Sequence, residues 1–469
     1  MPKSQVNRRT FLSAAAAAAG LAALAACTAA PPPPTPTSAT PAEKPSAKPS
    51  EKPASGGQPV AAGKPGDRPK IFTMVDKTWA DLGMADATLR FNQDYADLGD
   101  VTLEETAQGW ETKVLQQIKD KSLRWSGHGY APFFSSYTYI KQGLAAPIDD
   151  YLKSSKIAWG QKQKDAYFTQ RIYDALLLDG KQYYIPMKAN VHLVGYRSDY
   201  VQQAGYDGFP KTWDDVDQMI TKLKPILEKQ DAVALGVSRD LFRTLGTAFT
   251  TFIEKPFDDD GVLKFESPEW FGWLEMVKKW YDMKMVRIDG PEHSEAWQKG
   301  KFAFSLGSHS QVRLGRQVWG SAKVSGAPPP QPNASQPPRT WIHIDSGFVF
   351  PDAPNPQLAT DWLLAILGPE GASAERWWKG VVTFSGQPVH QSMIDKALKD
   401  NKDLAEVYQI MQLVPNSQII TLPVAGAYAI VQAKMWPHLD RFFKGEVDLK
   451  QAMAATRKEV NEELAKQKK

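Results

Sequence analysis

The middle of the chain reads Asp179-Gly180-Lys181-Gln182-Tyr183-Tyr184-Ile185-Pro186, and Val191 to Tyr196 follows it closely. Tyr183 to Pro186 and Val191 to Tyr196 are short apolar runs of the kind that form strands. Nearer the amino terminus, Ile71 to Val75 predicts a further strand. Trp110 to Lys119 has apolar residues at helical spacing. The sequence therefore predicts an α/β fold.

Further helices and one long loop are predicted on the carboxyl-terminal side. Thr212 can cap a helix that starts at Trp213, because its hydroxyl can accept a hydrogen bond from the first turn. The part of the chain after Lys70 is longer than one hydrophobic core usually supports, so we expect two domains or lobes. The other predicted elements are two amphipathic helices (Trp270 to Met285 and Gln357 to Leu367), a polar helix (Leu449 to Lys469) and a proline-rich loop (Ser325 to Arg339).

The first 27 residues predict export. Asn7-Arg8-Arg9-Thr10-Phe11-Leu12 is typical of a twin-arginine signal, and the apolar run from Ala14 to Ala26 is too short to span a bilayer. Leu24-Ala25-Ala26-Cys27 closes this run with the only cysteine of the chain. Lipoprotein signal peptides place the acylated thiol at this position. We therefore expect residues 1–27 to be a signal peptide that ends at lipidated Cys27; the alternative is an incidental cysteine in an uncleaved anchor.

Residues 28–70 predict a disordered tether. They consist mainly of Pro, Ala, Ser, Lys and Gly, and they have almost no large apolar side chain that could form a core. Proline keeps such a segment extended, so it would act as a spacer between a membrane and a folded domain. A proline-rich ligand for a partner domain is the alternative. We expect an extracytoplasmic protein anchored to the outer face of the cell membrane.

Charge argues against nucleic acid as a partner. The formal net charge of the whole chain is +4, and the positive excess lies in the signal peptide and the tether. The remaining body is close to neutral and has no basic cluster, which is poor evidence for nucleic-acid binding. No second apolar run is long enough to span a membrane.

Five segments carry a family resemblance in a fixed order. The order as a whole resembles the extracellular solute-binding proteins of ABC importers, in the carbohydrate-binding branch that includes maltose-binding protein. Two departures stand out: Arg124-Trp125-Ser126 replaces the family's usual "P-D-V", and Arg197 stands where Asn is common. The five segments are Tyr139 to Leu152 (similar to "G-L-L-x-P-L-D-D-Y-L"), Asp179 to Pro186 ("D-G-K-x-Y-G-L-P"), Gly195-Tyr196-Arg197 ("Y-Y-N-K"), Pro210 to Asp215 ("P-x-T-W-D-E") and Trp297 to Phe304 ("F-x-x-G-K-A-A-M").

The resemblance implies a two-lobed periplasmic-binding-protein fold of type II, with crossing hinge strands and a ligand cleft between the lobes. Residues 71–188 and 341–383 would form lobe 1, and residues 189–340 and 384–469 would form lobe 2. The implied partners are a small solute, here a carbohydrate, and the permease subunits of an ABC transporter; no cofactor is implied. The 15 tryptophans support a sugar ligand, because an indole can stack on the apolar face of a pyranose.

The candidate ligand contacts lie at expected strand ends and loops. Tryptophans inside amphipathic helices, such as Trp270, Trp273 and Trp280, are expected to serve the core instead. Trp125 is the sharpest candidate, because a glycine-flanked loop, Ser126-Gly127-His128-Gly129, is expected to follow it and to allow close approach to a sugar; core packing is the alternative. The candidates are Asp76, Trp79, Trp125, His128, Lys188, Asn190, Arg239, Phe242, Arg243, His309, Trp341, Asp345 and Tyr428.

Two other classes compete with a binding protein. A secreted carbohydrate-active or cofactor-binding enzyme is one, and the acidic run Asp258-Asp259-Asp260 could supply paired carboxylates, although it reads better as a solvated turn. The sequence has no G-x-S-x-G or H-E-x-x-H motif, and none of its 7 histidines pair at metal-ligand spacing. The other class is a purely structural surface lipoprotein. We expect no enzyme activity and no metal.

Overall fold

The computed structural model describes residues 68–467, except 108, 260, 291, 385–386, 401–412 and 414–415. The predicted signal peptide, the lipidation site Cys27 and nearly all of the predicted tether lie outside the described residues, as does Asp260 of the acidic run. All helices and strands below belong to the unit that begins at Pro69.

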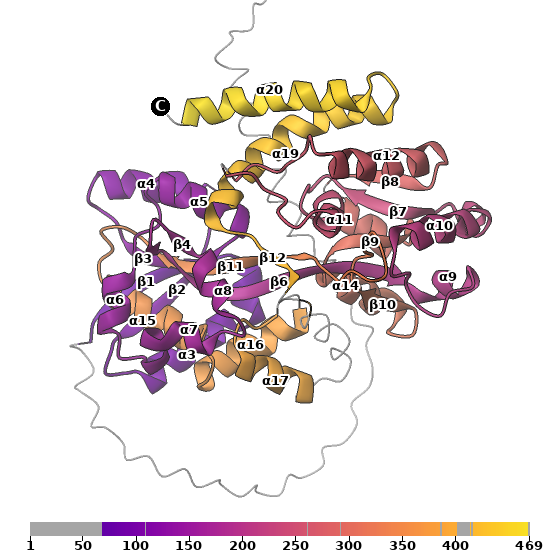
Figure 1. Cartoon of the computed structure of the whole chain (residues 1–469). Helices are drawn as coiled ribbons and strands as arrows, with labels where there is room; N and C mark the ends of the chain where they lie inside the picture. Colours follow the sequence, from indigo (N-terminus) through magenta and orange to yellow (C-terminus); the bar gives the residue numbers. More distant parts are fainter. Residues whose placement is uncertain are drawn as a thin grey trace, which may run out of the picture. The chain divides into compact units, whose positions relative to one another are not determined.

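The described chain alternates strands and helices (Figure 1). The strands are β1 (Lys70–Val75), β2 (Asp100–Glu105), β3 (Trp125–Ala131), β4 (Leu177–Leu178), β5 (Lys181–Gln182), β6 (Tyr184–Arg197), β7 (Val233–Ser238), β8 (Val286–Asp289), β9 (Phe302–Ser308), β10 (Val324–Ala327), β11 (Trp341–Val349) and β12 (Gln418–Ile419). The helices up to the end of β6 are α2 (Lys77–Trp79), η1 (Ala80–Met84), α3 (Ala85–Asp94), α4 (Trp110–Lys119), α5 (Phe133–Lys141), α6 (Asp149–Ser154), η2 (Ala158–Lys162), α7 (Gln163–Ala166) and α8 (Gln170–Ala175). The later helices are α9 (Ser198–Gln203), α10 (Trp213–Leu227), η3 (Glu228–Gln230), α11 (Thr244–Phe252), α12 (Pro268–Asp282), α13 (His293–Gln298), α14 (Ser310–Trp319), α15 (Pro356–Ile366), α16 (Ala372–Phe384), α17 (Gln391–Asp400), α19 (Leu422–Phe443) and α20 (Leu449–Gln467).

One mixed sheet runs through the unit in the order β2-β1-β3-β11-β6-β9-β7-β8. β1 pairs in parallel with β2 and β3, and β7 pairs in parallel with β8 and β9. β6 is the long strand between these two groups: Ile185 to Val191 pair antiparallel with β11, and His192 to Tyr196 pair antiparallel with β9 (Figure 1). β6 and β11 are therefore the strands that cross from one half of the sheet to the other.

The buried apolar side chains form two main clusters. The first cluster gathers around β1, β3 and the first half of β6, and the second around β7, β9 and helices α10 to α12. Along β6 the chain passes from the first to the second cluster between Leu193 and Val194, and along β11 it returns between Trp341 and Ile342. The first cluster also includes Trp297 of α13, Phe302 of β9 and Val312 of α14, so the two clusters lie close together at the crossing.

The lobe ranges predicted from the resemblance stay a proposal, in which we change one boundary. The crossings in β6 and β11 lie within a few residues of the predicted boundaries. The boundary at residue 383 is too early, because Met393 and Ile394 of α17 pack in the first cluster. We propose that the last passage into lobe 2 lies near Ile420, where the second cluster begins again.

Most predicted elements occur where the sequence placed them. α4 spans Trp110–Lys119 as predicted, and Thr212 caps α10 by accepting a hydrogen bond from the backbone N–H of Asp215 at 3.2 Å. Tyr183 to Pro186 and Val191 to Tyr196 are not two strands, because Met187 to Asn190 between them continue the single strand β6. The proline-rich loop is entered through β10, which pairs with β6.

The predicted loop after Trp125 is wrong. Trp125 and the residues after it form β3, which lies between β1 and β11. Gly127 and Gly129 serve packing rather than ligand approach. A Cβ on Gly127 would lie 2.8 Å from the carbonyl oxygen of Phe348, and one on Gly129 would lie 2.4 Å from Sδ of Met84.

Candidate functional site

The two crossing strands share one polar face. On β6, Lys188, Asn190 and His192 alternate with apolar residues, so their side chains point to the same side of the sheet. On β11, His343 and Asp345 alternate with apolar residues in the same way. The strand register places His343 beside Asn190 and Asp345 beside Lys188. These buried polar groups therefore meet where the chain passes between the two cores.

Three of these side chains form a closed hydrogen-bonded network. Nζ of Lys188 lies 2.6 Å from Oδ2 of Asp345, and both side chains are only 5% exposed. Asn190 joins both groups: its Oδ1 accepts from Lys188 at 3.0 Å, and its Nδ2 donates to Oδ2 of Asp345 at 3.1 Å. The other oxygen, Oδ1 of Asp345, accepts from the backbone N–H of Phe133 at 3.1 Å. The Lys188 ammonium also lies 5.1 Å from the ring centroid of Trp79.

Two histidines extend the polar face toward β9. Nε2 of His192 lies 3.0 Å from Nδ1 of His343, and Nδ1 of His192 lies 2.7 Å from Oγ1 of Thr247. Burial, together with nearby positive groups, holds the pKa of both histidines well below its ordinary value, so both rings are neutral at physiological pH. The indole N–H of Trp341 donates to Nδ1 of His192 at 3.1 Å and to the backbone oxygen of Phe242 at 2.9 Å.

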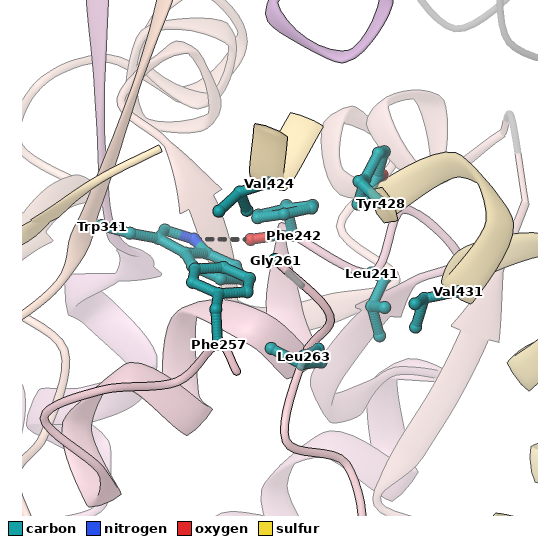
Figure 2. Close-up of a pocket in the computed structure, with 9 residues that line it drawn as sticks. All are labelled: Leu241, Phe242, Phe257, Gly261, Leu263, Trp341, Val424, Tyr428 and Val431. Atoms are coloured by element: carbon teal, nitrogen blue, oxygen red, sulfur yellow. Dashed lines mark hydrogen bonds between the residues drawn. The ribbon is translucent and has the colours of Figure 1, made fainter. Parts of the chain in front are cut away.

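An aromatic cluster adjoins the polar face on the side of the second hydrophobic cluster. The ring of Phe242 lies 4.2 Å from Trp341 and 4.1 Å from Tyr428 between centroids, and Phe257 stacks on Trp341 at 6.0 Å. These four residues, with apolar residues of α19 and the 241–263 segment, line a cavity of about 10 Å³ (Figure 2). That volume has room for about one water molecule.

Comparison with known proteins identifies the family. The bacterial extracellular solute-binding protein family matches this chain over residues 86–406, which is more than half of its length. This chain belongs to that family. The predicted membership among solute-binding proteins is confirmed.

Individual relatives are remote. Proteins described as binding proteins from Brucella abortus (strain 2308) and Brucella suis biovar 1 (strain 1330) are each 26% identical to this solute-binding protein over 88 residues. The match covers 19% of this chain and only 20% of each relative's length.

Solved structures confirm the fold. The sugar-binding protein MalE from Xanthomonas citri matches with a TM-score of 0.67 at 17% identity, over 85% of this chain and 98% of MalE. A protein described as an oligosaccharide periplasmic-binding protein from Synechococcus sp. MITs9220, solved in complex with zinc, matches with a TM-score of 0.65 at 14% identity, over 85% of this chain and 99% of the other. The α/β fold with two lobes and crossing strands, as predicted, is thus the fold of this solute-binding protein.

Seven predicted contact residues gather around the crossing. Lys188, Asn190 and Asp345 form its polar network, and Trp341 and Tyr428 belong to the aromatic cluster. Phe242 joins Trp341 and Tyr428, and Trp79 reaches the network through Lys188. Their contact with a ligand stays a prediction.

Arg243 and His309 lie beside this group. Nε of Arg243 binds Oδ2 of Asp240 at 3.2 Å, and the hydroxyl of Tyr428 donates to the same carboxylate. His309 is 2% exposed, and neither ring nitrogen has a hydrogen-bond partner among the described residues. Burial, with the nearby charges of Arg313 and Lys188, lowers the pKa of His309 well below its ordinary value. A neutral imidazole with two unpaired nitrogens could exchange hydrogen bonds with a ligand.

Asp76 directly follows β1, at the carboxyl end of the parallel strands. Burial, together with the carboxylate of Glu111, raises the pKa of Asp76 to about 6. Among the residues that the structure describes, no hydrogen bond connects Asp76 to the network of the crossing strands, so its role in binding stays a prediction.

Three predicted contacts lie away from this group. Trp125 begins β3, at the opposite end from the carboxyl edge; its indole is 4% exposed and donates to Oε2 of Glu104 at 2.8 Å. His128 packs between Trp110 and Phe348 in the first core, and burial lowers its pKa to about 3. These positions favour structural roles for Trp125 and His128.

Arg239 is the third of these residues. Its guanidinium binds both carboxylate oxygens of Asp440, at 2.7 and 3.0 Å, and lies over the ring of Trp436. This bidentate pair ties β7 to α19, so it favours a role in holding α19 in place.

Four residues at the crossing were not predicted from the sequence: His192, His343, Thr247 and Phe133. A signal existed for the first two. Polar residues recur at every second position from Lys188 to His192 and again from His343 to Asp345. In a strand this period predicts one shared face. Thr247 and Phe133 lie on helices far away in sequence, and no local pattern connects them to the crossing.

A buried Ser–His–Asp arrangement between β8, α13 and β9 does not form an exposed site. Nε2 of His293 lies 2.9 Å from Oγ of Ser305, and its Nδ1 lies 3.6 Å from Oδ2 of Asp289. Ser305 is fully buried, and Asp289 is also held by Nε of Arg287 at 2.7 Å. A substrate could not reach this hydroxyl, so the arrangement is structural.

In the part of the chain that the structure describes, no group of three or more His, Cys, Asp and Glu residues could hold a metal ion. Within the same residues, no helix has the length and apolar character needed to cross a membrane.

Proposed function

We propose that this solute-binding protein captures a sugar or oligosaccharide at the crossing strands and delivers it to an ABC permease. The observation that carries the proposal is the buried network of Lys188, Asn190 and Asp345 next to the aromatic cluster of Phe242, Trp341 and Tyr428. Charged and amide groups can fix sugar hydroxyls, and aromatic rings can stack on the apolar faces of the sugar. The sugar-binding MalE fold is consistent with this ligand class.

Binding requires the two lobes to separate and close again. Pockets for drug-sized ligands usually have about 300–1,000 Å³, whereas the cavity at the aromatic cluster has about 10 Å³. β6 and β11 are continuous through both cores, so twisting in them would move one lobe against the other. We expect the ligand-free protein to exchange between open and closed forms, and a saturating sugar to favour the closed form and so to lower the radius of gyration measured by solution scattering. An unchanged radius at saturation would overturn hinge closure and leave binding intact.

The acceptor and the anchor are part of the same proposal. A protein held at the outer face of the membrane by acylated Cys27 and the tether would release its solute to permease subunits in that membrane. The family membership supports this role. It also favours binding over catalysis, and we propose that the protein has no enzyme activity.

The test is a panel of monosaccharides and oligosaccharides screened by thermal shift, followed by calorimetry. A ligand at 100 times its Kd stabilises a protein by about 2.7 kcal/mol, so a true ligand gives a clear shift. We expect Asn190→Ala to weaken binding at least tenfold, about 1.4 kcal/mol. Asn333→Ala is the matched control, because it removes the same amide from an exposed loop.

Two results would overturn the proposal. Failure of every sugar in the panel to bind the folded protein would exclude a carbohydrate ligand. Chromatographic recovery of a cleaved sugar after incubation would support the alternative, a secreted carbohydrate-active enzyme.

A further inference from the structure

Phe133 is a residue of lobe 1 whose ring lies in the core of lobe 2. It is the first residue of α5 and follows β3 and Pro132, which belong to lobe 1. Yet its side chain is 8% exposed and packs in the second hydrophobic cluster rather than in the first. Phe133 is therefore a contact that must break whenever the two lobes separate.

The Phe133 ring fills a slot between three aromatic side chains. It lies on His343 of β11 at 4.2 Å between centroids, with an interplanar angle of 31°. Phe242 meets it edge-on at 5.5 Å, and Tyr428 lies 5.8 Å away. His343 pairs with Asn190 in the sheet, so this slot opens directly on the polar network. We name these three side chains, His343, Phe242 and Tyr428, the ring slot.

The backbone N–H of Phe133 also forms a hydrogen bond with the network. It donates to Oδ1 of Asp345, while Oδ2 of the same carboxylate serves Lys188 and Asn190. If the start of α5 moved away, one carboxylate oxygen would lose its donor next to an emptied aromatic slot. A sugar hydroxyl could replace this donor, because an unpaired buried acceptor is unfavourable.

We propose that the ring slot is the stacking subsite of the ligand and that Phe133 is its internal occupant, which the ligand displaces. The inference rests on the proposed function. A phenyl ring and a pyranose are both six-membered rings, and the slot offers the tilted face of His343, the rings of Phe242 and Tyr428, and the Asp345 carboxylate at its edge. The slot therefore selects a ligand with a six-membered ring that has one apolar face and a hydroxyl at its rim. Phe133 competes with this ring and lowers the affinity.

The test compares the wild-type protein with Phe133→Ala and Phe134→Ala, using phenol and the sugar found in the panel. Phenol is a ring-sized probe that does not depend on the sugar assignment. We expect phenol to raise the melting temperature of Phe133→Ala in a saturable way and to leave the other two proteins unchanged. We expect the sugar to bind Phe133→Ala at least tenfold more tightly than wild type and to displace phenol. Phe134→Ala is the matched control, because this neighbour loses an identical ring that contacts Phe133 at 5.5 Å between centroids and is not one of the three slot residues.

Phe133→Leu is a second variant, which keeps the proposal testable if Phe133→Ala does not fold. Leucine keeps an apolar side chain in the slot but lacks the flat ring, so we expect sugar affinity between that of wild type and that of Phe133→Ala. Weaker sugar binding by the folded Phe133 variants would overturn the proposal and make Phe133 a ligand contact.

Two further outcomes would also overturn the proposal while the proposed function stands. Phenol could fail to bind folded Phe133→Ala, or it could bind without being displaced by the sugar. If no sugar bound any of these proteins, the proposed function itself would fail, and the phenol result would then report only on the slot.

Discussion

The Lys188 ammonium is buried, so the loss of one of its partners should strongly lower the free energy of unfolding. It is almost fully buried and relies on the carboxylate of Asp345 and the amide of Asn190. A buried ion pair contributes little net stability compared with a well-packed apolar pair, but one buried charge left alone is strongly unfavourable. The stability contribution of each of these three side chains therefore depends on the presence of the other two.

We expect Asp345→Ala to lower the free energy of unfolding by about 3–5 kcal/mol, because it leaves the Lys188 charge unpaired. The double variant Lys188→Met/Asp345→Ala should recover part of this loss, since it removes the stranded charge. Urea unfolding of the three proteins measures both effects. A loss below 1 kcal/mol in the single variant would show that water reaches Lys188 and that the network is not buried as described.

Asp76 gives a pH-dependent prediction. Its pKa is raised to about 6 by burial and by Glu111, so the folded protein keeps a proton that the unfolded chain releases near pH 4. The stabilising contribution is complete below about pH 4 and is lost as the pH rises through 6. We expect Asp76→Asn to match wild type at pH 4 and to be more stable at pH 8, by at most about 3 kcal/mol. Urea unfolding at the two pH values measures this difference, and an equal effect at both would contradict the raised pKa.

Trp125 tests the difference between a ligand contact and a core residue. Its indole is buried at the start of β3 and bonded to Glu104, far from the carboxyl ends of the parallel strands. We expect Trp125→Ala to lose about 3–5 kcal/mol of stability, as buried aromatic residues do, and to bind the panel sugar normally once folded. A tenfold loss of affinity with an unchanged melting temperature would instead make Trp125 a ligand contact.

At the scale of elements, α11 shows how the crossing constrains its neighbours. Gly246 lies in this helix, where alanine is normally more favourable by about 1 kcal/mol. However, a Cβ on Gly246 would lie 2.1 Å from Cζ2 of Trp341, the indole that bonds to His192. The glycine lets the helix pack directly against the ring.

We expect Gly246→Ala to destabilise the protein by about 1–3 kcal/mol, the usual cost of overpacking, despite the better helix propensity. Gly272→Ala in α12 is the matched control, because a Cβ there has nothing within 4 Å. The control should be stabilised by about 1 kcal/mol. Thermal unfolding of both variants measures the two changes in stability. A change in the same direction for both variants would contradict the contact with Trp341.

The elements were easier to predict from the sequence than the site. Helices such as α4 and α10 carry their own spacing and caps, so local pattern was enough. β3 was missed because its glycines hide the alternation of a strand, and their reason lies in Met84 and Phe348, which are distant in sequence. The Asp345–Phe133 contact likewise depends on how the two lobes pack, which no local window contains.

At the scale of the whole molecule, attachment and binding should be separable. Cys27 lies outside the described residues, and the candidate site lies entirely in the unit that begins at Pro69. We expect Cys27→Ser to release the protein from the membrane fraction without changing its affinity for the panel sugar. Fractionation and calorimetry measure the two properties, and a variant that stays membrane-bound would contradict the lipoprotein prediction.

The position of β11 in the sheet has a consequence for biosynthesis. β11 lies between β3 and β6, although both of these strands leave the ribosome long before it. Until Trp341 to Val349 is translated, β3 and β6 each present an edge that has no partner, and such edges invite pairing with other chains. The growing chain would therefore need chaperone protection until late in synthesis. A signal of the twin-arginine type would suit this order, because it would let the chain close its sheet in the cytoplasm before it meets the membrane.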